Sequence, residues 1–108
     1  SDLFKVLISL TGIERKGAQF AFTVADRPGC IRELTDTIRS YGGRILSILS
    51  SSNHVPRGKR KLYIRVSGLD RPRLDRLKSI FLDEGILRYL VFFEGIRRQL
   101  FLADLFPE

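Results

Sequence analysis

The feature that most constrains the fold is a repeated change in residue pattern between positions 18 and 93. Four stretches carry the pattern of β-strands, and two carry the three-to-four-residue apolar spacing of helices. In chain order they are strand 18–24, helix 31–41, strand 44–52, strand 61–67, helix 71–84 and strand 86–93. This order predicts one α+β domain, the ferredoxin-like βαββαβ fold, with a four-stranded antiparallel sheet and two helices on one face.

The 44–52 strand is expected at an edge of this sheet, because the βαββαβ topology gives the strand order 4-1-3-2. Its apolar residues alternate on both faces, Ile45 and Leu49 on one and Leu46 and Ile48 on the other. An exposed apolar edge strand promotes association with another strand. We therefore expect a homodimer formed through 44–52.

Composition narrows the class of protein. No apolar run approaches the roughly 20 residues of a membrane span, and no segment resembles a secretion signal. The chain has one Cys, which excludes an internal disulfide and fits a reducing cytoplasm. Nineteen Lys and Arg against twelve Asp and Glu give a net charge of +7, which attracts anions without specifying which. We expect a cytoplasmic protein that is not inserted in a membrane.

The joint between the first strand and the first helix reads Val-Ala-Asp-Arg-Pro-Gly-Cys, residues 24–30. It could be a turn, a catalytic elbow around Cys30, or a place where a ligand meets the backbone. Pro28 would set the helical φ of the first turn, and Gly29 has no Cβ to block a ligand. The free N–H groups at the helix start would attract a carboxylate, and Asp26 could pair with an ammonium group. Alternatively, Asp26 only caps the helix and Gly29 only makes the turn.

Catalysis is not expected. A reactive Cys30 would need a base, and His54, the one histidine, belongs to a loop after the second strand. The sequence has no metal-ligand cluster, no paired carboxylates and no phosphate-binding loop. We expect a protein that is not an enzyme and has no cofactor, with Cys30 as a small, partly buried side chain.

Two motifs in residues 18–93 resemble the ACT domain family. Asp26-Arg27-Pro28-Gly29 follows the first strand, and Tyr41-Gly42-Gly43-Arg44-Ile45 opens the second. The resemblance implies a regulatory, allosteric module that binds a small molecule, often an amino acid, between two copies. The ligand-binding residues that it implies are Asp26, Arg27, Pro28, Gly29, Cys30 and Ile31 of one copy with Arg44, Ile45, Leu46 and Ser47 of the other.

This chain departs from the family pattern at two positions. Arg44 stands where the family often has Asn, and Val24 replaces a polar residue found in some serine-binding members. Arg44 of one copy could form a salt bridge with Asp26 of the other and fill the site, or it could serve as an anion-binding arm. A degenerate pocket in a purely structural dimerisation module is the alternative.

The ends of the chain suggest a larger protein. Residues 1–12 resemble the last helix of a CBS domain, and bacterial proteins with a CBS pair before an ACT domain include ones annotated for acetoin utilisation. A preceding CBS pair would also explain the absence of Met. Residues 13–17 are interpreted as a linker. The tail, 94–108, carries apolar residues at helical spacing.

RNA binding is the remaining alternative, because the RNA-recognition motif has the same topology. That module stacks bases on aromatic residues of its central strands. Here Phe20 and Phe22 should face the helices, which leaves Tyr63 as a poor platform on the open face. We therefore rank nucleic acid below a small-molecule ligand.

Overall fold

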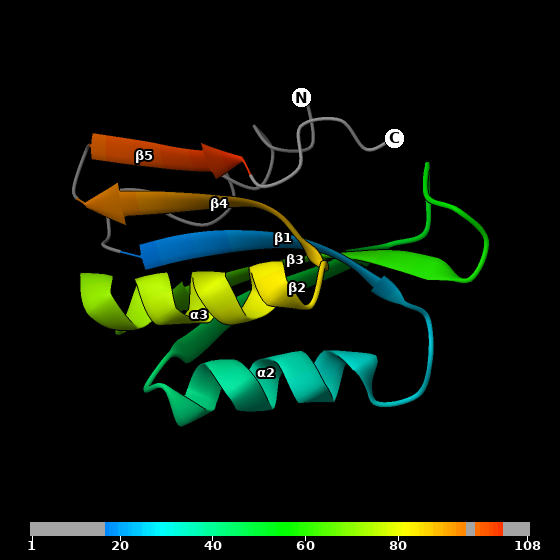
Figure 1. The fold of residues 1–108 in the computed structure, drawn as a ribbon, viewed down its shortest axis with the longest axis horizontal. Helices are drawn as coiled ribbons and strands as arrows, with labels where there is room; N and C mark the ends of the chain where they lie inside the picture. The colour runs from blue at the N-terminus through cyan, green and yellow to red at the C-terminus, as the bar shows by residue number, and fades with distance from the viewer. Residues whose placement is uncertain (1–16, 95–96, 103–108) are drawn as a thin grey trace.

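A computed structural model describes residues 17–94 and 97–102 (Figure 1). The expectations for residues 1–12, and for the linker up to residue 16, lie outside the described residues. The elements are β1 (Gly17–Ala25), α2 (Cys30–Ser40), β2 (Arg44–Ser51), β3 (Lys59–Ser67), α3 (Arg71–Asp83), β4 (Leu87–Glu94) and β5 (Arg97–Leu102). Within these described residues, no helix is long and apolar enough to cross a membrane.

The first six elements form the ferredoxin-like fold that the residue pattern predicts. The sheet order is β2-β3-β1-β4-β5, and every neighbouring pair is antiparallel. Both helices lie on the same face of the sheet (Figure 1). The expected order 4-1-3-2 is therefore confirmed for the first four strands, and β2 is an edge strand.

The described part of the tail does not form the helix that the spacing of its apolar residues suggests. Residues 97–102 form β5, which pairs along β4. The pairing is antiparallel and runs from Glu94 with Arg97 to Tyr89 with Leu102. Pairing with β4 satisfies N–H and C=O groups that would otherwise line an open edge, and this outweighs the helical spacing of the apolar residues.

The core lies between the sheet and the two helices. Phe81 of α3 packs edge-on against Phe20 and Phe22 of β1, with ring centroids 5.7 and 4.9 Å apart. Leu34 and Ile38 bring α2 onto the same cluster. This packing fixes both helices against β1 and so positions the loop between β1 and α2.

Strand β2 contains an irregularity that changes which residues share a face. Its register with β3 shifts between Ile45 and Ser47. As a result Ile45 pairs with Val66, and Ile48 pairs with Ile64. Val66 and Ile64 are both buried core residues, so Ile45 and Ile48 lie on the same face of the sheet. The expectation that Ile48 faces away from Ile45 is therefore wrong, because an extra residue in one strand shifts the alternation by one.

Candidate functional site

Gly29 sets the conformation of the loop between β1 and α2. This residue is the N-cap of α2, and its φ of +84° lies in the left-handed region, which favours glycine. Pro28 precedes the N-cap and does not occupy the first helical turn, in contrast to the expectation. No side chain caps the helix, so Asp26 does not act as the cap that the alternative interpretation requires.

The start of α2 presents unpaired backbone donors. The first bonds across the joint run from the Cys30 N–H to the Arg27 carbonyl at 3.2 Å and from the Glu33 N–H to the Gly29 carbonyl at 3.0 Å. Among the described residues, the N–H groups of Ile31 and Arg32 have no acceptor. Unpaired donors at a helix N-terminus favour a negatively charged group nearby.

Asp26 ties this loop to the hairpin between β2 and β3. Its backbone N–H donates to the Gly58 carbonyl at 2.8 Å, and its Oδ1 lies 3.1 Å from Nη2 of Arg60. The side chains of Arg60 and Asp26 are 34% and 43% exposed. Because ion pairs at such exposed positions add little stability, this pair can be exchanged for contacts with a ligand.

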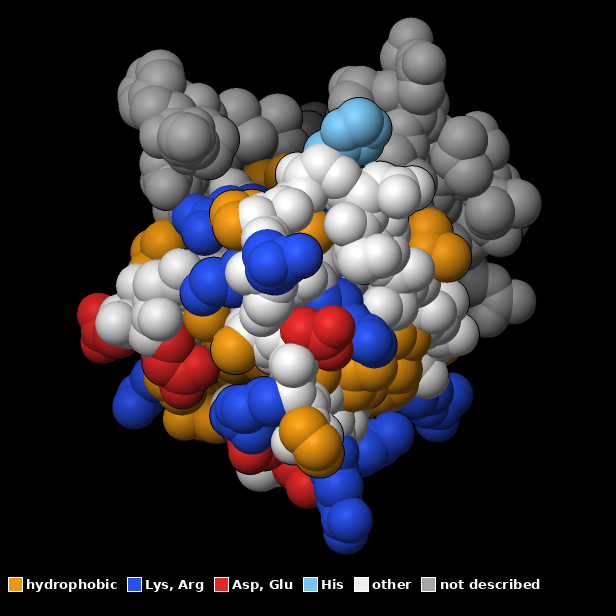
Figure 2. Space-filling view, turned by 90° about the vertical axis from the view of Figure 1, so that its right-hand side faces the viewer, with side chains coloured by type: hydrophobic (Ala, Val, Ile, Leu, Met, Phe, Trp, Pro, Cys, Tyr) orange, Lys and Arg blue, Asp and Glu red, His pale blue; other side chains and the backbone are white. Residues whose placement is uncertain are grey.

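A cavity of about 790 Å³, here called the loop cavity, lies at this joint. All six loop residues expected at the site line it, together with three that the sequence analysis missed. The lining consists of Asp26, Arg27, Pro28, Gly29, Cys30, Ile31, Arg32, Thr35 and Arg60. Figure 2 shows this end of the molecule, where basic and acidic side chains lie close together on the surface.

The second half of the expected site lies elsewhere in the same chain. Arg44 pairs with Ser67 at one end of the sheet, whereas Ala25, beside the loop, pairs with Lys59 at the other end. Arg44, Ile45, Leu46 and Ser47 do not line the loop cavity. Within one chain, the cation beside Asp26 is therefore Arg60, and the segment 44–47 is not brought to the loop.

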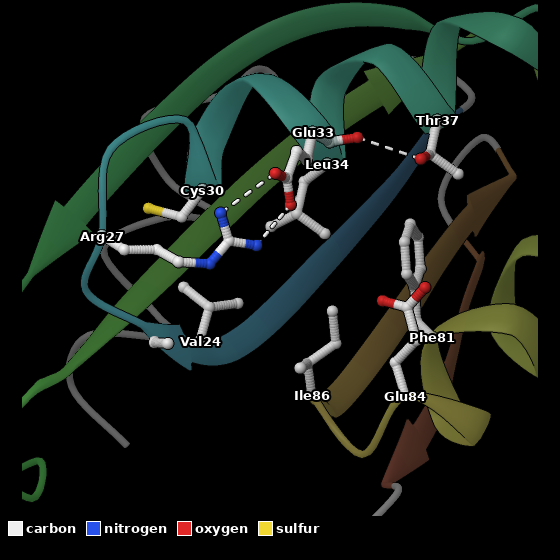
Figure 3. A pocket seen from close by; sticks show the side chains of 10 residues that line it. Val24, Arg27, Cys30, Glu33, Leu34, Thr37, Phe81, Glu84 and Ile86 are labelled. Carbon is white, nitrogen blue, oxygen red and sulfur yellow. Dashed lines mark hydrogen bonds and ion pairs between the residues drawn. The ribbon is translucent and has the colours of Figure 1, made fainter.

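Arg27 turns toward α2 and pairs with Glu33. The two guanidinium nitrogens lie 3.0 and 2.5 Å from the two carboxylate oxygens (Figure 3). The hydrogen bond from Arg27 lowers the pKa of Glu33, and the same contact raises the pKa of Arg27. Both arginines of the loop cavity are thus in ion pairs, Arg27 through two contacts with Glu33 and Arg60 through one contact with Asp26.

Cys30 is 8% exposed and lines the cavity wall at the first helical residue. His54 lies in the hairpin between β2 and β3. In the described residues no three His, Cys, Asp or Glu side chains gather as a metal site would require.

The face of the sheet opposite the helices carries a shielded polar cluster. Tyr63 is 8% exposed, and Gln19 and Arg65 are fully buried. Burial raises the pKa of both Tyr63 and Tyr89. Because stacking with a base requires an accessible ring, buried Tyr63 is a poor RNA platform in this conformation.

Comparison of the chain with models of known protein families and with curated proteins found no match. The function is therefore inferred from the geometry of the site and from the motifs in the sequence.

Proposed function

We propose that this chain is a regulatory ACT domain that binds a small amino-acid-like molecule in the loop cavity, at the interface of a homodimer. The observation that carries the proposal is the loop cavity itself. Its lining includes the first residues of α2, which have unpaired N–H groups, and both members of the Asp26–Arg60 ion pair. It also includes every residue of the Asp26-Arg27-Pro28-Gly29 motif.

The charges in the cavity complement a zwitterion. A ligand ammonium group replaces Arg60 beside Asp26. The ligand carboxylate then meets the released Arg60 guanidinium and the N–H groups at the start of α2. Charge-assisted hydrogen bonds of this kind are about twice as strong as neutral ones, whereas the surface ion pair that they replace contributes little.

The edge strand supports a second copy as the other wall of the site. Leu46, Ile48 and Leu49 are 46%, 40% and 39% exposed, which is unusual for three large apolar residues on one strand. A twofold axis between two antiparallel β2 strands would place the start of one strand beside the end of the other.

This pairing would bring the segment 44–47 to the loop cavity of the partner. Ser51, at the end of β2, pairs with Lys61, which in turn pairs with Thr23 close to the loop. The start of the partner's β2 would lie beside Ser51. Arg44 of the second copy would then add positive charge near the ligand carboxylate.

We further propose that the domain is not catalytic and acts by allosteric coupling. A ligand held between two copies favours one relative arrangement of them, and an attached domain can respond to it. The resemblance of residues 1–12 to the end of a CBS domain suggests a CBS pair as that neighbour, in a cytoplasmic protein of the kind annotated for acetoin utilisation.

A thermal-shift screen of the 20 amino acids and several organic acids tests this proposal. A ligand at 100 times its Kd should stabilise the domain by about 2.7 kcal/mol, or several degrees. Asp26→Asn and Arg60→Gln should each remove most of the shift. Asp75→Asn is the matched control, because this exposed carboxylate lies on α3 outside the loop cavity, and its ion-pair partners Arg71 and Lys78 do not line the cavity.

Three results would count against the proposal. The first is a flat screen with a dimer in solution, which would indicate a structural dimerisation module with a degenerate pocket. The second is a shift that survives both Asp26→Asn and Arg60→Gln. The third is a shift that Asp75→Asn removes equally.

A further inference from the structure

A second cavity lies between the two helices and opens beside α2 (Figure 3). We call it the interhelical cavity; its volume is about 330 Å³. Its floor is apolar, because Val24, Leu34 and Phe81 are buried core residues. Arg27 and Cys30 line both cavities, but the remaining lining is different.

The charged side chains at the rim of the interhelical cavity carry a net negative charge. On the α2 side, the Arg27 guanidinium is paired on both nitrogens with Glu33, so this pair is neutral overall. On the α3 side, Glu84 also lines the cavity (Figure 3). Among the described residues, the Glu84 carboxylate has no ion pair. One negative charge at the rim is thus left without a partner.

The position of Glu84 in α3 makes the electrostatic potential at this rim more negative. Glu84 is the C-cap, where the helix dipole places its negative end. A Lys, Arg or His in the last turn would offset that end, but the last turn of α3 contains none. The carboxylate and the helix terminus therefore both favour a cation at the same point.

We propose that the interhelical cavity binds a small organic cation, namely a protonated amine with one apolar substituent. The ammonium group pairs with Glu84 at the end of α3, and the apolar substituent packs on Val24, Leu34 and Phe81. The volume lies at the lower end of the roughly 300–1,000 Å³ of small-molecule sites, so the ligand is small. Every part of this site comes from one copy, so it depends neither on pairing of β2 nor on the loop cavity.

Titration of the ¹⁵N-labelled chain with 2-phenylethylamine tests the proposal, with backbone amide shifts as the readout. We expect saturable shifts at Val24, Leu34 and Ile86, with a Kd on the order of 1 mM. The neutral analogue 2-phenylethanol and the anion 3-phenylpropanoate should bind at least about threefold more weakly, because they cannot pair with Glu84.

Two neighbouring carboxylates provide a matched pair of variants. Glu84→Gln removes the charge at the rim and should weaken the amine about three- to fivefold, because an exposed ion pair contributes up to about 1 kcal/mol. Asp83→Asn removes an exposed charge one residue earlier that does not line the cavity, and it should change the Kd by less than about twofold. Both positions are exposed, so folding should be preserved.

Four results would overturn the inference. The first three are the absence of saturable shifts in the interhelical cavity, equal affinity for the alcohol and the amine, and an unchanged Kd in Glu84→Gln. Shifts confined to Gly29 and Arg60 would place the amine in the loop cavity and would also overturn it. Because these residues report separately, failure here leaves the proposed amino-acid site untouched.

Discussion

At the scale of single residues, Gly29 decides how the site is built. Its positive φ allows the chain to turn from β1 directly into α2 without a side-chain cap. A Cβ added at Gly29 would meet no atom within 4 Å, and the same is true at Gly85, whose φ is +74°. The two glycines therefore carry the same conformational strain, but only Gly29 lines the loop cavity.

We predict that Gly29→Ala and Gly85→Ala each lower the free energy of unfolding by about 1–2 kcal/mol, the cost of a left-handed alanine. Urea denaturation measures both. Only Gly29→Ala should also weaken a ligand of the loop cavity, because its methyl group enters that space. Equal effects of the two variants on binding would show that Gly29 only makes the turn.

The loop residues of the candidate site were predictable from the sequence, whereas Arg60, the ion-pair partner of Asp26, was not. Asp26 and Gly29 stand in a local motif between two elements, and the sequence shows them directly. Arg60 is 34 positions beyond Asp26, and the pairing of β1 with β3 brings them together. Because Arg60 sits in a run of basic residues, the sequence alone favours a solvated hairpin tip.

At the scale of elements, the order of strands and helices followed from residue pattern, but two details did not. The register shift in β2 depends on how its backbone matches β3, which the alternation of side chains does not reveal. The strand β5 forms in a segment whose apolar spacing favours a helix, because backbone pairing with β4 overrides local spacing. Edge strands are thus where local pattern predicts structure least well.

The exposed apolar residues of β2 lead to a prediction about assembly. Ile48→Asp should convert a dimer to a monomer, because a buried charge at the twofold axis has no partner. Leu82→Asp is the control, since Leu82 is 38% exposed and lies on α3, which contacts β4, whereas α2 contacts β2. Sedimentation velocity distinguishes the two species. A dimer that survives Ile48→Asp but not Leu82→Asp would place the interface on the helices.

At the scale of the whole molecule, the proposed site would link ligand binding to dimerisation. One copy would contribute Asp26 of the β1–α2 loop and Arg60 of β3, and the partner would contribute residues 44–47, so the site would be complete only in the dimer. By thermodynamic linkage, the ligand must then strengthen the dimer as much as the dimer strengthens ligand binding. This coupling is the physical basis of the proposed regulatory role.

The most direct test of this account is sedimentation equilibrium with and without the amino acid that gives the largest thermal shift. For two independent sites present only in the dimer, ligand at ten times its Kd should lower the apparent dimer dissociation constant about 100-fold. A dissociation constant that does not change while the ligand is bound would contradict the account, because the site would then be complete within one copy.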